Sequence, residues 1–219
     1  PPLRGGGGEW RLRVTEREPA GPAPYGIHLN TAQARKRLRH ERYVVLRKLL
    51  PSGLHELLQL WYASLRRPEA VTRTANFQEK TRRHEYLPEA LSTYLNLALV
   101  PFASAMAGAV VAPTYPFPIT YVPGGGIHPH LDVSDNELSL TYQVQLEGAA
   151  GWPLTFLDPR GQELNNLNAS TAKTVTLGDN DGILYYGPDL VHWREPRPHT
   201  LTQIVFAFRE EDEAHCNNQ

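Results

Sequence analysis

The chain has 219 residues, of which 41% are hydrophobic and 21% charged, a composition typical of a folded protein. This length fits one large domain that buries roughly 70% of the surface of its unfolded chain. No uninterrupted apolar run approaches the ~20 residues that cross a bilayer, so no membrane span is expected. A single cysteine, Cys216, excludes an internal disulfide and a cysteine-based zinc cluster, and we expect a reducing, cytoplasmic location.

The net charge of −1 hides an uneven distribution along the chain. Residues 1–100 contain 17 Lys/Arg and 9 Asp/Glu, whereas residues 101–219 contain 5 and 14. A basic half can indicate an anionic partner such as nucleic acid. The basic residues fall at helical surface spacings, without the interleaved aromatic residues of a nucleic-acid-binding motif. We therefore expect the two halves to pack together, and nucleic acid is not the expected partner.

The first part of the chain predicts a lead-in followed by helices. Residues 1–26 are rich in Gly and Pro and predict a flexible segment that can hold one short strand over 9–15. Residues 27–219 then form a single domain, whose helical part covers 27–110. Helices are expected over 32–41, 54–66 and 89–99, the last able to continue to 106, with a short strand over 43–46. The apolar stripe expected to face the core from the second helix consists of Leu54, Leu57, Leu58, Trp61 and Leu65.

The part from 111 to 210 has a different character, with short extended runs bounded by turn residues. These runs predict strands over 119–122, 138–146, 154–157, 173–177, 183–186, 191–194 and 201–208. Strands of this length and spacing are typical of a jelly-roll, or double-stranded β-helix, as in cupins. The predicted fold class is α+β, with the N-terminal helices packed on the outside of one sheet of this β-roll.

Two histidines and one aspartate form the pattern with the most chemical information. His130 and Asp132 follow a glycine turn and are two residues apart, so on an extended strand both side chains point to the same face. His192 lies 60 residues later, at the start of another predicted strand. Two imidazoles and a carboxylate on one side of a metal form a facial triad, which leaves positions open on non-haem Fe(II) for a bidentate cosubstrate and O₂. We expect these three residues to be the metal ligands and the catalytic centre.

On this triad and its surroundings, the sequence resembles the Fe(II)/2-oxoglutarate-dependent oxygenases, especially the prolyl-4-hydroxylase-like and phytanoyl-type branches. The resemblance covers the chain from about residue 31 onward, including the segments 40–51, 113–121 and 178–186. It implies a dioxygenase that uses Fe(II), 2-oxoglutarate and O₂ to hydroxylate a small-molecule, amino-acid or peptidyl substrate, with release of succinate and CO₂. Halogenating relatives have a small residue at the position of Asp132, so this aspartate indicates hydroxylation.

The sequence departs from the family at the basic residue that binds the distal carboxylate of 2-oxoglutarate. Many members place Arg or Lys about ten residues after the distal histidine, where this chain has Thr202 and Gln203. Arg194 is two residues after that histidine and would share its inward face, one step deeper in the roll. We predict that Arg194 binds the carboxylate. Arg209, on the same face as Gln203 by parity, is the second candidate and could equally bind substrate.

Neutral side chains offer a third way to hold the same carboxylate. Tyr121 lies nine residues before His130 and resembles the tyrosine that hydrogen-bonds this group in the family; together with Gln203 it could replace an arginine. Further residues that could line the interior of the roll are Trp152, Trp193, Tyr142, Gln143 and Phe156.

Two other classes of function remain open at this point. One is a cupin-like metal-binding or sugar-binding β-roll without oxygenase activity, which the missing basic residue at 202–203 supports. The other is an oxygenase that acts on nucleic acid, for which the basic half is the only indication. The identity of the substrate and the oligomeric state are not predicted.

Overall fold

The computed structural model describes residues 31–148, 151–160 and 168–211. The predicted lead-in over 1–26 and its short strand lie outside the described residues. The elements follow in chain order: α1 (Thr31–Glu41), β1 (Tyr43–Leu46), α2 (Ser52–Leu65), α3 (Pro68–Thr74), β2 (Ala75–Gln78), β3 (Arg83–Tyr86), α4 (Ala90–Ala107), β4 (Val111–Tyr121), β5 (Gly125–His130), β6 (Leu138–Glu147), β7 (Leu154–Leu157), η1 (Ala169–Thr171), β8 (Lys173–Val175), β9 (Gly182–Tyr186), β10 (Val191–Arg197) and β11 (Thr200–Glu210).

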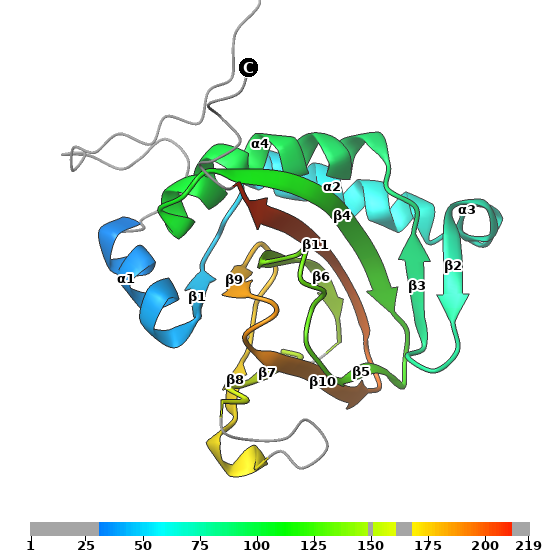
Figure 1. Ribbon diagram of the computed structural model, residues 1–219. Helices are drawn as coiled ribbons and strands as arrows, with labels where there is room; N and C mark the ends of the chain where they lie inside the picture. Colours follow the sequence, from blue (N-terminus) through cyan, green and yellow to red (C-terminus); the bar gives the residue numbers. More distant parts are fainter. Residues whose placement is uncertain (1–30, 149–150, 161–167, 212–219) are drawn as a thin grey trace, which may run out of the picture.

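The strands form two antiparallel sheets that face each other (Figure 1). The larger sheet has the order β1-β9-β6-β11-β4-β3-β2 and the smaller has the order β5-β10-β7-β8. This arrangement confirms the predicted double-stranded β-helix. The strand predicted over 43–46 is β1, at one edge of the larger sheet. The part before residue 110 is nevertheless less helical than expected, because β2 and β3 also come from it and join the other edge.

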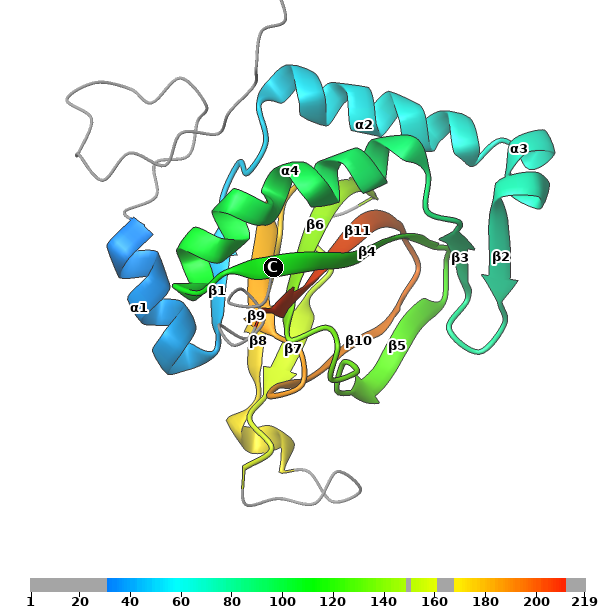
Figure 2. The same ribbon diagram turned by 45° about the horizontal axis from the view of Figure 1, so that its top comes forward.

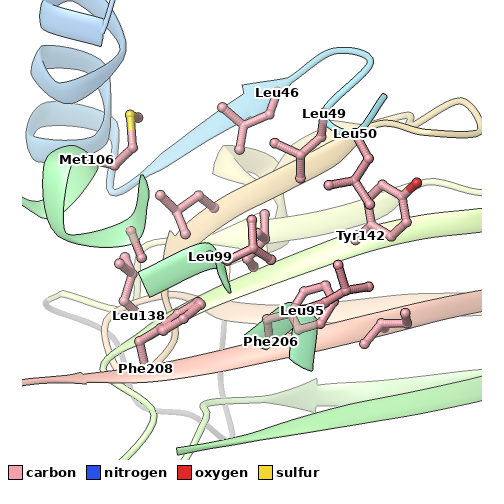
Figure 3. Close-up of a cluster of buried hydrophobic side chains, with 14 of the residues drawn as sticks. Leu46, Leu49, Leu50, Leu95, Leu99, Met106, Leu138, Tyr142, Phe206 and Phe208 are labelled. Carbon is pink, nitrogen blue, oxygen red and sulfur yellow. The ribbon is translucent and has the colours of Figure 1, made fainter. Parts of the chain in front are cut away.

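The helices α2 and α4 cover the outer face of the larger sheet, as predicted (Figure 1, Figure 2). Alternate side chains of β6 and β11 point outward into this layer, where they pack against α4 in the main hydrophobic cluster of the described residues (Figure 3). Leu140 and Phe206 are fully buried there, as is Met106 of α4. Burial of one such side chain stabilises the fold by roughly 1.5–3 kcal/mol, so this cluster contributes much of the stability of the folded state.

The buried stripe of α2 differs from the prediction. Leu58 and Tyr62 are buried, whereas Leu57 is 50% and Trp61 38% exposed. The face against the sheet therefore runs through Leu54, Leu58, Tyr62 and Leu65 and is narrower than the apolar stripe of the sequence. Apolar residues beyond the contact face remain exposed because the helix lies on the surface of the molecule.

Helix α4 is long and apolar enough, by length and composition alone, to cross a membrane, with a mean hydropathy of 1.4 over its 18 residues. This is weak evidence for a span, because a core helix passes the same test. One face of α4 packs on the sheet through Leu95, Leu99 and Ala103. The helix begins after Glu89, which caps the first amides, and ends at Gly108, whose positive φ of 78° suits glycine.

A hairpin formed by β2 and β3 extends the larger sheet beside β4, and its turn is tied to the glycine turn 124–126. The amide of Gly126 donates to the carbonyl of Thr81 at 3.0 Å, and the amide of Val122 donates to the carbonyl of Arg82 at 3.0 Å. A side chain on Gly126 would come within 2.7 Å of the carbonyl oxygen of Arg194. The glycines thus allow β4, the hairpin and β10 to approach closely, in agreement with the turn role predicted for them.

Ion pairs join the basic and acidic halves of the chain. Arg66 pairs with Glu147 at 2.6 Å, Arg47 pairs with Asp181 at 2.6 Å, and Arg42 pairs with Asp189. In each pair the cation comes from residues 31–100 and the carboxylate from the β-roll. In the described part of the chain, the basic and acidic halves therefore pack against each other, as expected.

Candidate metal centre

Three predicted ligands meet at one end of the β-roll. His130 ends β5 and lies directly opposite His192 of β10, and the centroids of their rings are 4.2 Å apart. Asp132 follows two residues after His130, just beyond the end of the strand, and its Oδ1 lies 3.9 Å from His130 Nε2 and 3.5 Å from His192 Nε2. All three ligand atoms lie within 4.8 Å of one another, a spacing at which they could hold one metal ion.

Backbone carbonyls select the imidazole nitrogen that faces this centre. The Nδ1 of His130 lies 2.9 Å from the carbonyl of His128, and the Nδ1 of His192 lies 3.0 Å from the carbonyl of Leu190. A carbonyl can only accept, so each Nδ1 carries the proton and each Nε2 keeps its lone pair for a metal. Burial, with His192 as a further cause, lowers the pKa of His130, which favours the neutral imidazole that a metal requires.

Asp132 is held as an oriented carboxylate. Its Oδ2 accepts a hydrogen bond of 2.7 Å from the Ser139 hydroxyl, which leaves Oδ1 towards the two histidines. Burial opposes ionisation, but the adjacent His192 and the hydrogen bond from Ser139 hold the pKa of Asp132 below its usual value. A side chain at Gly187 would come within 2.3 Å of this carboxylate, so only glycine fits there.

Tyr185 stands beside the centre and is fully buried on β9. Its hydroxyl lies 3.4 Å from His192 Nε2 and 3.4 Å from the hydroxyl of Thr141. Burial, with the nearby Asp132 carboxylate as a further cause, raises the pKa of this phenol well above its usual value. Tyr185 is therefore a neutral hydrogen-bonding group next to the ligand nitrogen of His192.

Arg194 lies deeper in the same roll, as its two-residue spacing from His192 predicts. Its side chain is buried, with 1% of the residue exposed. Its Nη1 donates to the backbone carbonyl of Trp152, whereas its Nε and Nη2 have no partner. Burial lowers the pKa of Arg194 to about 10 against the opposing effects of Tyr121 and Tyr185, so the guanidinium still carries its charge at neutral pH. Nε–H and Nη2–H point along one edge of the guanidinium, the edge that binds a carboxylate bidentately.

Other polar side chains are buried in the same roll. Tyr121 is 1% exposed and its ring lies 5.4 Å from that of Trp152. Gln203 of β11 is buried opposite Gln143 of β6, and the Oε1 atom of each glutamine is unpartnered. Unpartnered buried polar groups are uncommon in folded proteins, and several together mark a site that a polar ligand completes.

Arg209 does not reach this site, contrary to the parity prediction. Ala207, two residues earlier, lies opposite Ser139, so Arg209 stands beyond the level of Asp132 at the open end of the roll. Its side chain is exposed there. The parity of a residue in a strand indicates which face of the sheet its side chain is on, but not how far along the roll it lies. The end of β11 extends beyond the roll, and Arg209 lies there.

Among the residues expected to line the roll, Gln143, Trp152 and Phe156 are buried between the sheets, whereas Tyr142 packs in the outer cluster under the helices. Trp193 is also directed elsewhere, since its Nε1 donates to the Glu195 carboxylate at an exposed position. Adjacent residues of one strand face opposite ways, so Tyr142 and Gln143 could not both line the interior.

Three neighbours of the site were not singled out from the sequence: Ser139, Tyr185 and Arg83. Ser139 lies in a strand with clear alternation, and a serine at an inward position of such a strand is a signal in the sequence that could have identified it. Tyr185 and Arg83 carry no comparable signal, because only the packing of β9 and β3 brings them near the centre.

Neither a family model nor a curated protein matches the sequence. Solved structures do share its fold. A prolyl-4-hydroxylase from Pseudomonas putida is 15% identical, with 83% of this chain and 100% of that chain covered at a TM-score of 0.60. An oxidoreductase of the 2OG-Fe(II) oxygenase family from Burkholderia pseudomallei is 18% identical, with 84% and 92% covered at 0.60. The epimerase SnoN, in complex with Fe3+, alpha ketoglutarate and nogalamycin RO, is 14% identical, with 82% and 83% covered at 0.62.

These likenesses show the fold of the chain, which is that of the 2OG-Fe(II) oxygenases. The neighbours themselves are named for different reactions, one as a hydroxylase and another as an epimerase. The reaction of this chain therefore has to be argued from its own site.

Proposed function

We propose that this chain, which has the fold of the 2OG-Fe(II) oxygenases, is an Fe(II)- and 2-oxoglutarate-dependent dioxygenase that hydroxylates a C–H bond. The observation that carries the proposal is the unpartnered edge of Arg194, buried in the same roll as the open His130, Asp132 and His192 cluster. A cation buried with two free donors is costly unless an anion completes it. A dicarboxylate that also reaches the metal would do so.

The donor set suits the metal. Two neutral imidazoles and one carboxylate on one side of an ion leave the remaining positions open, the facial arrangement of non-haem Fe(II) oxygenases. When bound, Fe(II) would activate O₂ and couple the oxidative decarboxylation of 2-oxoglutarate, to succinate and CO₂, to oxidation of the substrate. The carboxylate of Asp132, in place of a small residue, supports hydroxylation in preference to halogenation.

The residues of the chain have distinct parts in this proposal. His130, Asp132 and His192 hold the metal. Arg194 binds the distal carboxylate of 2-oxoglutarate in a bidentate pair, and Tyr121 and Gln203 contribute hydrogen bonds to the same group from β4 and β11.

The substrate is proposed to be a small molecule, an amino acid or a peptidyl side chain that approaches from the side of His130. The side chain of His130 is 35% exposed, compared with 5% for His192, so the open face of the cluster lies there. Hydroxylation takes place where this face meets the buried cosubstrate site.

Succinate formation from 2-oxoglutarate without added substrate tests the proposal. Purified protein with Fe(II), ascorbate and 2-oxoglutarate should form succinate slowly, and the Asp132→Ala variant should form none. Absence of succinate from a folded, metal-binding wild type would favour the cupin-like alternative. A metabolite panel titrated into the protein loaded with Mn(II) and 2-oxoglutarate would then identify the substrate class.

A further inference from the structure

Arg83, on the β2–β3 hairpin, makes contacts that its role in the fold does not explain. Its side chain is only 13% exposed, and its Nε and Nη2 donate to Oε1 of Glu85 at 2.9 and 2.6 Å. Its remaining nitrogen, Nη1, donates to the hydroxyl of Tyr121 at 3.4 Å. The ion pair with Glu85 thus fixes the guanidinium in a position from which one nitrogen is directed at the phenol.

Tyr121 interacts electrostatically with both Arg83 and Arg194. Burial alone would lower the pKa of Arg83, but Tyr121 and Glu85 together raise it, and Tyr121 also opposes the effect of burial on Arg194. A hydroxyl that accepts a hydrogen bond from Arg83 keeps its own proton for another acceptor. The ring of Tyr121 is fixed against Trp152, whose backbone carbonyl accepts from Arg194. The proton of the Tyr121 hydroxyl is therefore available to an acceptor bound near Trp152 and Arg194.

We propose that Arg83 is a positioning residue for the cosubstrate, which holds the Tyr121 hydroxyl as a donor towards the carboxylate bound by Arg194. This inference rests on the proposed function, since it assumes that a carboxylate occupies the site. Arg83 itself does not touch the carboxylate and acts through the phenol. The β2–β3 hairpin, whose turn is hydrogen-bonded to the glycine turn that precedes His130, is thereby part of the proposed cosubstrate site.

A double-mutant cycle on 2-oxoglutarate affinity tests this role. The dissociation constant is measured by titration calorimetry on Mn(II)-loaded protein for the wild type, Tyr121→Phe, Arg83→Met and the double variant. A hydrogen bond to a charged group predicts a loss of about tenfold for Tyr121→Phe, and we expect about fivefold for Arg83→Met. The double variant should bind no more than about twofold worse than Tyr121→Phe, because the two side chains act through one hydrogen bond.

Lys80→Met is the matched control for the loss of a positive charge, because Lys80 is exposed in the turn of the same hairpin. It should leave 2-oxoglutarate affinity unchanged, and Mn(II) affinity should be unchanged in every variant. If Arg83→Met does not fold, Arg83→Lys replaces it. Lysine keeps the charge but lacks the rigid fork by which arginine holds Glu85 and the phenol together, so we expect a smaller loss that again disappears in the Tyr121→Phe background.

Normal 2-oxoglutarate affinity in folded Arg83 variants would overturn the positioning role alone, as would losses that multiply in full in the double variant. Wild-type protein that binds Mn(II) but no 2-oxoglutarate would overturn the proposed function and this role together. The two failures are therefore distinguishable in one set of titrations.

Discussion

Along β6 and part of β11, the two faces of the larger sheet are equally buried but differ in polarity. On β6, the outward residues Leu140, Tyr142 and Val144 are 0% exposed and pack under the helices. The inward residues Ser139 and Thr141 are at most 1% exposed, yet they are polar, as is Gln143. Strand β11 repeats the contrast, with Phe206 and Phe208 outward and Gln203 inward.

This contrast separates stability from function within single strands. Outward side chains such as Leu140 and Phe206 lie in the hydrophobic cluster under the helices, so their burial stabilises the fold. Among the inward side chains, the Oε1 atoms of Gln143 and Gln203 have no partner. Such unpartnered groups destabilise the free protein and suit it to a polar ligand. Substitutions on each face test this division, beginning with those of largest expected effect.

The largest effect is expected at the metal end of the inner face. Asp132→Ala removes a proposed ligand, so it should abolish Fe(II)-dependent succinate formation and weaken Mn(II) binding by more than about 100-fold. Ser139→Ala removes only the hydrogen bond to that ligand and should weaken Mn(II) binding by about 10–100-fold. Wild-type turnover by Asp132→Ala would reject the triad.

The next effect is expected at the deep end of the inner face. Arg194→Met should weaken 2-oxoglutarate binding by a few hundredfold, because an unpaired buried carboxylate costs about 3–5 kcal/mol. The same variant, unfolded in urea without ligand, should be as stable as the wild type or more stable, since two of the buried donors have no partner. Arg209→Met is the matched control at an exposed position and should bind normally.

The reverse result would relocate the anchor. Normal affinity in Arg194→Met together with weak binding in Arg209→Met would place the carboxylate at the end of β11. If neither variant binds less tightly, neutral donors must hold the carboxylate and the oxygenase proposal loses its main support.

Two adjacent residues of β6 compare the faces directly. Leu140→Ala, on the outer face, should lower the free energy of unfolding by about 2–5 kcal/mol and leave Mn(II) and 2-oxoglutarate affinity unchanged. Thr141→Val, on the inner face, should cost about 1 kcal/mol, because it removes only the hydroxyl that lies 3.4 Å from Tyr185. Equal costs in urea unfolding would contradict the division of the two faces.

The smallest effect expected is on the pH dependence of stability, at His55 of α2, which contacts the outer face of the sheet. The Nδ1 of His55 lies 2.7 Å from the hydroxyl of Tyr142, and burial lowers the pKa of His55. The unfolded state therefore binds a proton more readily than the folded state, and stability should fall as the pH decreases below about 6.5. His55→Gln should show a weaker pH dependence than the wild type in urea unfolding at pH 7.5 and 5.5. An unchanged dependence would show that other histidines are responsible.

The elements that could be predicted are those whose signal is local in the chain. Strands with clear alternation, such as 138–146 and 154–157, were expected nearly as they occur. Most of β4 was not, because Pro113, Pro116 and Pro118 interrupt its pattern. The structure accommodates them because β3 pairs only with the end of β4, over Ile119–Tyr121, so the proline positions need no donor on that side. The hairpin of β2 and β3 was missed as well.

The candidate metal ligands could be predicted from the sequence alone, because a two-residue spacing and a strand start are local features that indicate which side chains share a face. The difference between the two candidate anchors, Arg194 and Arg209, appears only in the tertiary structure. Both satisfy the parity of an inward face, but one is buried behind Trp152 and the other extends past the end of the roll. Depth depends on where each strand begins relative to its neighbours, which is set by the packing of β5, β10 and β11 and not by the spacing within any one of them.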